Sequence, residues 1–479
     1  MYLLPETSFI PPFSGYAALT PLVILLLAVF WGLFANYLPG KDRGASIAGL
    51  VAALLAAVAS AFVTPGTELF GGRFLYTLDV RFAAVVVCIL VALWCLWTLG
   101  SGVGRTREAI SLVMLSSIGA IIAMAATDLI VLILALELTA MPGYVLIGYR
   151  RYRIRGLEAA LKYFLLSALS TLVMIYGMSF LVGLAGSTTF EGITQMPSEP
   201  LTLVAFGLVF FGLLAKLSAA PFHWWSPDAC EGSESWAIAY ASVIPKIVVV
   251  LVIARLVFIA AASVPLIHLI ILMVAIMSLI VGAFAALTQR DIRRMIAYSG
   301  VACAGYILVA LFVVSMGGEH AQAAFYAAIF YVVAYAISAM GVLLISAHEG
   351  SKVADLSGLA QRNPFAAFSL TIFALSLIGL PPLAGFFAKL NLFLAVIAAG
   401  QIEVVVLAVL MAVVSAFYYL RLIRAAFFGE EKIEEESTDV DRIKKSPYSV
   451  CGNVVIATLV VMVILLGILY QPIMNLLVG

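Results

Sequence analysis

The chain has 479 residues, of which 64% are hydrophobic and 11% are charged, and its mean hydropathy is +1.16. A water-soluble surface cannot be built from this composition, so a polytopic protein embedded in a lipid bilayer is predicted. The formal net charge of +1 gives no indication of a nucleic-acid partner. The cysteines include no CxxC pair and the histidines show no metal-ligand spacing, which argues against iron–sulfur, zinc and disulfide sites. No P-loop or GxGxxG motif indicates nucleotide binding.

Apolar runs of about 20 residues, the length that crosses a bilayer as an α-helix, recur from one end of the chain to the other. The predicted fold class is therefore an all-α membrane protein with about fourteen transmembrane helices. These are expected at 17–37, 45–64, 79–99, 108–125, 128–148, 158–183, 200–222, 237–259, 265–287, 295–315, 320–347, 364–395, 402–428 and 449–476. The longer connecting loops are expected at 65–78, 184–199, 223–236, 348–363 and 429–448.

Lysine and arginine fall almost entirely on one side of this predicted arrangement. That side holds Lys41, Arg43, Arg105, Arg107, the RRYRIR run at 150–155, Arg290, Arg293, Arg294, Lys352, Arg362 and the cluster from Arg421 to Lys445. The opposite side holds only Arg73 and Arg81. By the positive-inside rule the basic side is cytoplasmic, which places both termini on the outer side. The N-terminus lacks a basic n-region, so a cleaved signal peptide is not expected.

Five basic residues remain inside the predicted spans, with a single mid-span carboxylate, Glu137. The bases are Lys162, Lys216, Lys246, Arg255 and Lys389. Lys162 lies near a helix start beside Glu158, and Arg255 lies toward the outer face, so both side chains can extend to the membrane surface. A structural role is favoured for Arg255. For Lys162 a structural role and a role in the function are equally compatible with the sequence. The other three lysines cannot easily reach water.

Three buried bases and one acid cannot all be paired, and each buried ammonium costs about 2.5 to 3.5 kcal/mol or more. Desolvation disfavours the charged form of a lysine, and a nearby carboxylate restores it. We therefore predict a relay in which a lysine holds a proton, releases it when its counter-ion moves away, and passes it along a hydrated path. The alternative is that the charges only hold helices together, but that role would normally balance the signs.

Prolines interrupt two of the spans that carry these lysines. Pro221 follows Lys216, and Pro381 and Pro382 precede Lys389. Proline removes backbone hydrogen bonds, and non-helical backbone within a membrane is tolerated only where it lines protein or a water cavity. Broken helices 7 and 12 in corresponding halves predict two inverted five-helix repeats with the site near the midplane. The expected segments are 1–107 with three helices, 108–262 as the first repeat, 263–428 as the second, and 429–479 as a cytoplasmic loop with a last helix.

Over nearly its full length the chain resembles the bacterial antiporter-like N subunit of proton-pumping NADH:quinone oxidoreductase, respiratory complex I. The resemblance is carried by EAALKYFLLSALSTLVMIYG from Glu158, AKLSAAPFHWWSPDACEG from Ala215, PK at 245–246, TQRDIRRMIAYSG from Thr288, GLPPLAGFFAKLNLF from Gly379 and SAFYYLRLIRAAFF from Ser415. A lysine after PPLAGFF is similar to the N subunit, whereas the M-type sister usually carries glutamate there. The long C-terminal lateral helix that the L-type sister carries is not expected here.

The resemblance implies that Glu137 and Lys216 form the acid and base of the first half-channel. It further implies that Lys246 is the central relay and Lys389 the terminal base, which exchanges protons with the outer face. It implies no redox cofactor in this chain: flavin, iron–sulfur clusters and quinone belong to partner subunits. The implied partners are a neighbouring antiporter-like subunit and small subunits of the membrane arm, in the bacterial inner membrane.

The chain departs from the family pattern at Cys303, where relatives commonly have histidine, and in GSESWAIAYASVIPK, where they usually have a proline-rich segment. Cys303 has two interpretations, a relay residue and a simple core cysteine, and the core role is favoured because a buried thiol is a poor proton shuttle at neutral pH. Tyr298 with nearby water is a further relay candidate. His223 is expected near the cytoplasmic entrance, either passing protons or bonded to the backbone.

Two other functions are compatible with broken helices and buried lysines. A subunit of a multi-subunit cation/proton antiporter would exchange ions without redox coupling. A membrane spacer without conduction would leave pumping intact when Lys216 is replaced. HWWSPDACEG and YYLRLIRAAFF favour the complex I interpretation.

Overall fold

The computed structural model describes residues 13–34, 41–101, 106–150, 152–196, 198–264, 266–429 and 448–478. Within these residues, thirteen helical segments are long and apolar enough to cross a membrane. One further span, predicted at 364–395, consists of two shorter apolar helices. The prediction of an all-α polytopic membrane protein is thus confirmed. The predicted loop at 429–448 and the N-terminal twelve residues lie almost entirely outside the described residues.

The N-terminal segment contains the first three spanning helices and a short hairpin. Its elements are the 3-10 helix η1 (Phe13–Leu19), α1 (Thr20–Phe34), α2 (Lys41–Phe62), β1 (Thr67–Leu69), β2 (Phe74–Tyr76) and α3 (Leu78–Ser101). The strands are antiparallel, with Thr67 opposite Tyr76. This hairpin occupies the predicted loop at 65–78 and is the only sheet among the described residues.

Eight helices follow the N-terminal segment. They are α4 (Thr106–Ala125), α5 (Leu129–Ile147), α6 (Ile154–Ala185), α7 (Phe190–Thr194), α8 (Pro200–Leu217), α9 (Trp225–Gly232), α10 (Ser235–Ala241) and α11 (Ile244–Ser263). The loop expected at 223–236 therefore holds a helix, α9, because the chain resumes helical geometry once it has passed Pro221. The span expected at 237–259 is divided into α10 and α11.

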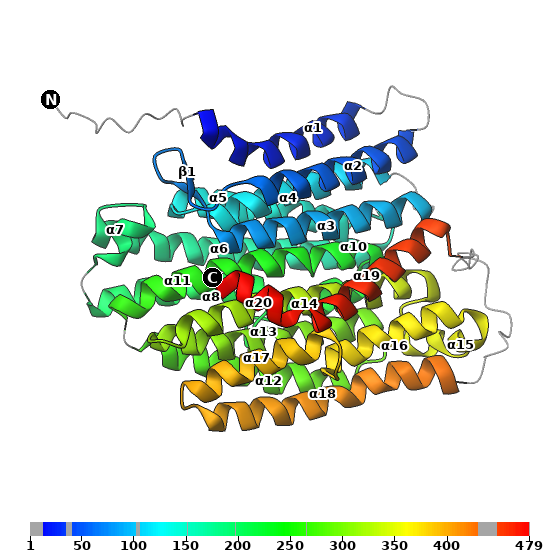
Figure 1. Ribbon diagram of the computed structural model, residues 1–479. Coiled ribbons are helices and arrows are strands. Elements are labelled where there is room, and N and C mark those ends of the chain that lie inside the picture. Colours follow the sequence, from blue (N-terminus) through cyan, green and yellow to red (C-terminus); the bar gives the residue numbers. More distant parts are fainter. Residues whose placement is uncertain are drawn as a thin grey trace.

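The remaining helices complete the bundle. They are α12 (Ile267–Leu287), α13 (Ile292–Met316), α14 (Ala321–Glu349), the 3-10 helix η3 (Val353–Leu356), α15 (Leu359–Arg362), α16 (Pro364–Ile378), α17 (Ala384–Ala398), α18 (Ile402–Phe428), α19 (Val450–Ile468) and α20 (Tyr470–Val478). The long helices lie side by side, with α1 at one edge of the view and α18 at the other (Figure 1). The C-terminal helix α19 packs against α3, α14 and α17.

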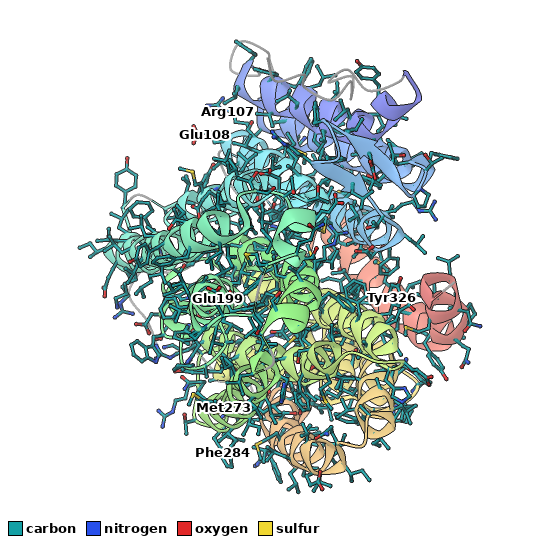
Figure 2. The ribbon with its side chains drawn as sticks, turned by 90° about the vertical axis from the view of Figure 1, so that its left-hand side faces the viewer. Arg107, Glu108, Glu199, Met273, Phe284 and Tyr326 are labelled. Carbon is teal, nitrogen blue, oxygen red and sulfur yellow. The ribbon has the colours of Figure 1, made fainter. Side chains whose placement is uncertain are left out.

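Burial separates an interior from a lipid-facing surface. In the most apolar 18-residue stretch of α14 every residue is buried, and in that of α13 94% of the residues are buried. In α12 and α18 the buried share of the corresponding stretch is 39%. Met273 and Phe284 of α12 point outward from the bundle, and their exposed fractions are 63% and 51% (Figure 2). Large apolar side chains on an outer surface are the composition that lipid requires. The polar chemistry therefore lies on α13, α14 and the helices packed around them.

Helix α12 meets α13 at unusually short range because of two glycines. A Cβ on Gly282 would overlap the backbone nitrogen of Ala302 and lie 2.8 Å from its Cα. A Cβ on Gly305 would lie 2.7 Å from the nitrogen of Leu279. Backbone atoms cannot move aside as a flexible side chain can, so both positions depend on the missing side chain.

Gly282→Ala is therefore expected to destabilise the protein by about 1 to 3 kcal/mol, because overpacking forces α12 and α13 apart. The measurement is the thermal unfolding midpoint of the detergent-solubilised protein. Gly183→Ala is the matched control, since nothing lies within 4 Å of a Cβ on that helical glycine. Its midpoint should stay unchanged or rise slightly, because alanine is the better helix former. Equal midpoints for the two variants would contradict the packing argument.

Candidate functional site

The site begins with an ion pair between two helices of the segment 108–262, α5 and α8. Lys216, in the last turn of α8, places its Nζ 2.8 Å from Oε1 of Glu137 on α5. The exposed fractions of the two side chains are 6% and 28%. A lysine in the last turn of a helix also faces the negative end of the helix dipole. The structure thus brings together the predicted acid and the first predicted base.

Hydroxyl groups from α6 complete this pair, and they were not predicted from the sequence. Thr171 donates to Oε1 of Glu137 at 2.5 Å, and Lys216 lies 3.5 Å from the Ser167 hydroxyl. The Tyr144 hydroxyl in turn donates to Ser167 at 2.6 Å. Ser167 and Thr171 are four residues apart and so share one face of α6, a periodicity that could have identified them.

Two small cavities adjoin Lys216. The first, of about 20 Å³, is lined by Lys216 together with Thr139, Ser167 and Ser170. The second, also of about 20 Å³, has both Lys216 and Lys246 on its wall, with Ser218, Ser226 and Ser242. A cavity of this size with several polar groups is large enough for a water molecule. The second cavity is therefore bordered by both the first base and the next one.

Lys246 is the base with the fewest compensating contacts. It stands in the first turn of α11, directly after the interruption between α10 and α11, and is 7% exposed. Its Nζ lies 5.5 Å from the ring centroid of Tyr335 on α14. Among the described residues, no hydrogen bond or ion pair to this amine is found. The first turn of a helix is the positive end of its dipole, which gives a cation no support.

Lys389 is compensated by backbone instead. It is 6% exposed, and its Nζ donates to the carbonyl oxygens of Leu377 at 3.2 Å and Ile378 at 2.8 Å. These residues end α16, where carbonyl groups lack partners within the helix. The same Nζ lies 5.1 Å from the ring centroid of Tyr306. No carboxylate lies within ion-pair distance of Lys389 in the described part of the chain.

Cys303 lies on α13 between the last two lysines. Its buried thiol lies close enough to Lys246, Lys389 and Tyr331 to interact with them electrostatically. The ring of Tyr331 is 5.6 Å from that of Tyr306, centroid to centroid. The thiol is therefore surrounded by buried phenol groups, which were not identified from the sequence because a buried tyrosine has no distinct sequence signal.

The other predicted relay candidates lie beside the buried row, where α9 packs against α6 and α13. Lys162 pairs with Glu158 at 2.8 Å and with Asp228 of α9 at 3.3 Å, and its side chain is 44% exposed. His223 lies in the segment between α8 and α9, with its ring 6.1 Å from that of Tyr298. Arg294 connects this region to α13 through Asp228 at 3.0 Å. These groups form a partly exposed network beside the buried row.

The three prolines that were predicted to interrupt helices lie in the segments between helices, close to Lys216 and Lys389 in the chain. Pro221 lies between the end of α8 at Leu217 and the start of α9 at Trp225, with Ser218 in the left-handed region at φ +62°. Pro381 and Pro382 lie between α16 and α17, after Gly379 at φ +92°. Both interruptions leave helix-terminal carbonyl groups inside the bundle.

Arg255 of α11 is held by structural contacts. It donates to the Thr77 hydroxyl at 2.7 Å, pairs with Asp79 at 3.0 Å, and donates to the carbonyl oxygen of Met124. It ties α11 to the N-terminal segment. Within the described ranges, no group of three or more His, Cys, Asp or Glu side chains is placed to hold a metal ion.

Comparison with known proteins identifies the family. The model described as NADH:quinone oxidoreductase/Mrp antiporter, transmembrane, matches residues 126–415. NADH-quinone oxidoreductase subunit N 1 of Rhizobium meliloti is 36% identical over 433 residues, which cover 86% of this chain and 88% of the relative. Subunit N of Rhodospirillum rubrum is 34% identical over 428 residues, 86% of each chain.

Solved structures agree with this assignment. A chain of respiratory complex I from Thermus thermophilus with bound aureothin superposes with a TM-score of 0.80 at 29% identity, over 96% of this chain and 100% of that one. A chain of the Mrp complex from Dietzia superposes with a TM-score of 0.79 at 20% identity, over 97% and 96%, and shares the fold. The chain belongs to the NADH:quinone oxidoreductase/Mrp antiporter transmembrane family and, within it, to subunit N of the NADH-quinone oxidoreductases.

Proposed function

We propose that this chain is a proton-translocating membrane-arm subunit of a respiratory NADH:quinone oxidoreductase. Protons move through the row Glu137, Lys216, Lys246 and Lys389, driven by quinone reduction in other subunits. The observation that carries the proposal is the Lys216–Glu137 pair at 2.8 Å beside a cavity that Lys216 shares with Lys246. A paired base adjoining an unpaired one can exchange its proton when the pair opens.

The relay follows from which charges are compensated. While Glu137 contacts Lys216, the carboxylate favours the ammonium form of that lysine. When the carboxylate moves away, the Lys216 ammonium loses its counter-ion and its proton passes to water in the shared cavity. Lys246, on the same cavity wall, accepts that proton and hands it toward Lys389. The Ser167 and Thr171 hydroxyls then help to re-form the pair.

We propose further that residues 108–262 and 263–428 are inverted repeats. Asp128 caps α5 by accepting from the backbone amides of Ile130 and Val131. Asp291 caps α13 in the same pattern, from Arg293 and Arg294. Each capping aspartate also forms an isolated antiparallel β-bridge with a residue that follows the next long helix. Asp128 pairs with Thr189, and Asp291 pairs with Lys352. Five spans lie between the two caps, so they fall on opposite membrane faces.

The proposal includes the setting of the chain. The asymmetry of lysine and arginine orients it with both termini outside a bacterial inner membrane. Flavin, iron–sulfur clusters and quinone would be held by other subunits, and a second antiporter-like subunit and small membrane subunits would adjoin this one. Exchange of a metal cation for protons without redox chemistry is the competing function.

Lys216→Ala and Lys389→Ala are each expected to lower proton uptake per quinone reduced several-fold, because each removes one base from the row. The measurement follows proton uptake and quinone reduction together in membrane vesicles that carry the whole assembled complex. Lys352→Ala is the control, since that lysine is exposed on the surface. Unchanged pumping in both row variants would refute the relay. Sodium-dependent proton exchange without quinone reduction would support the competing function.

Glu137→Gln is expected to destabilise the chain by about 3 to 5 kcal/mol, because it leaves the buried Lys216 ammonium without its counter-ion. Adding Lys216→Met removes the stranded charge, so the double variant should unfold at a higher temperature than Glu137→Gln alone. Thermal unfolding of the four members of this double-mutant cycle measures the coupling. Additive effects of the two substitutions would show that the pair contributes nothing.

A further inference from the structure

The two lysines without a carboxylate partner each lie over a tyrosine ring. Lys246 faces Tyr335 at 5.5 Å and Lys389 faces Tyr306 at 5.1 Å, from Nζ to ring centroid. Lys216, which has its carboxylate at 2.8 Å, has no ring in this position among the described residues. Along the row, each buried lysine therefore has either a carboxylate or an aromatic ring beside its amine, and none has both among the described residues.

Both rings are fixed by their hydroxyl groups rather than through the lysines. The Tyr335 hydroxyl donates to the carbonyl oxygen of Ile296 at 3.2 Å. The Tyr306 hydroxyl donates to that of Ala408 at 3.1 Å. Each bond joins the ring to a neighbouring helix. Among the described residues neither lysine donates a hydrogen bond to these hydroxyl oxygens, so the contact offered to each lysine is the aromatic ring.

A glycine borders each amine as well. A Cβ on Gly300 would overlap Nζ of Lys246 and lie 3.2 Å from the Tyr335 hydroxyl. A Cβ on Gly379 would lie 3.0 Å from Cδ and 3.5 Å from Nζ of Lys389. The two amines thus occupy similar sites, each bounded by a tyrosine and by a glycine on another helix or turn.

We propose that Tyr335 and Tyr306 are positioning residues that stabilise the ammonium forms of Lys246 and Lys389 in place of carboxylate partners. The face of an aromatic ring carries negative electrostatic potential and attracts a cation, most strongly away from water. Unlike a carboxylate, the face cannot accept the proton. It holds the charged lysine without competing for the proton that the lysine must pass on. This inference rests on the proposed proton relay.

The test compares Tyr335→Phe with Tyr335→Leu, and Tyr306→Phe with Tyr306→Leu, in vesicles carrying the assembled complex. The readout is proton pumping per quinone reduced as a function of pH. Leucine removes the ring face, so the lysine beside it loses its ammonium form at a lower pH. The alkaline limb of the profile should therefore shift to lower pH by about one unit. Phenylalanine keeps the face, and its profile should stay close to that of the unmodified protein.

Tyr240 provides the matched control. It is a buried tyrosine whose hydroxyl donates to the carbonyl oxygen of Val113 at 3.2 Å, and no lysine lies over its ring. Tyr240→Leu creates a similar packing defect, so a lower amount of assembled complex is expected, whereas the pH profile should stay in place. A shift of the same size in Tyr240→Leu would overturn the proposal.

Gly300→Ala tests the same contact without changing the ring, in case the leucine variants do not assemble. The added Cβ displaces the Lys246 amine from Tyr335, so the same downward shift of the alkaline limb is expected. Lys246→Ala separates the two proposals. If it retains full pumping, the relay itself is wrong. If it abolishes pumping while Tyr335→Leu and Gly300→Ala leave the limb unmoved, only the role of the ring is wrong.

Discussion

The bundle has to hold three lysines away from water with a single mid-span carboxylate, Glu137, to balance them. An unpaired ammonium at bilayer depth costs several kcal/mol, and a fold with marginal stability cannot leave three such costs uncompensated. Lys216 has a carboxylate partner, Lys389 has backbone carbonyl groups and the ring of Tyr306, and Lys246 has, among the described residues, only the ring of Tyr335. Helices α5, α13, α14 and α16 provide these groups.

Interrupted helices make this compensation possible. A continuous helix uses its own carbonyl groups, whereas the end of α16 at Ile378 leaves carbonyls free to accept from Lys389. Lys216 benefits from the C-terminal end of α8, where the dipole favours a cation. Lys246 stands at the opposite kind of end, in the first turn of α11. The middle of the row is therefore the least supported position for a charge.

The spans and the buried charges could be predicted because both depend on local composition. Twenty apolar residues cross a bilayer whatever their neighbours, and a lysine within them is conspicuous. Helix α9 was missed because WSPDACEG lacks the apolar period and forms its helix after the break at Pro221. Tyr306 and Tyr335 were missed for another reason: their place beside lysines on other helices depends on tertiary packing alone.

A row in which only one lysine has a carboxylate partner suits a proton relay better than a row in which every lysine has one. If every lysine had a carboxylate, each proton would rest in a stable ion pair and each transfer would have to break one. In the proposed row only the Lys216–Glu137 pair has to open, and that pair is the partly accessible one, with Glu137 28% exposed. A conformational change arriving from other subunits would therefore need to act on a single contact between α5 and α8. Beyond it, ring faces and backbone carbonyls hold a charge without claiming the proton, so the later transfers need no second ion pair to break.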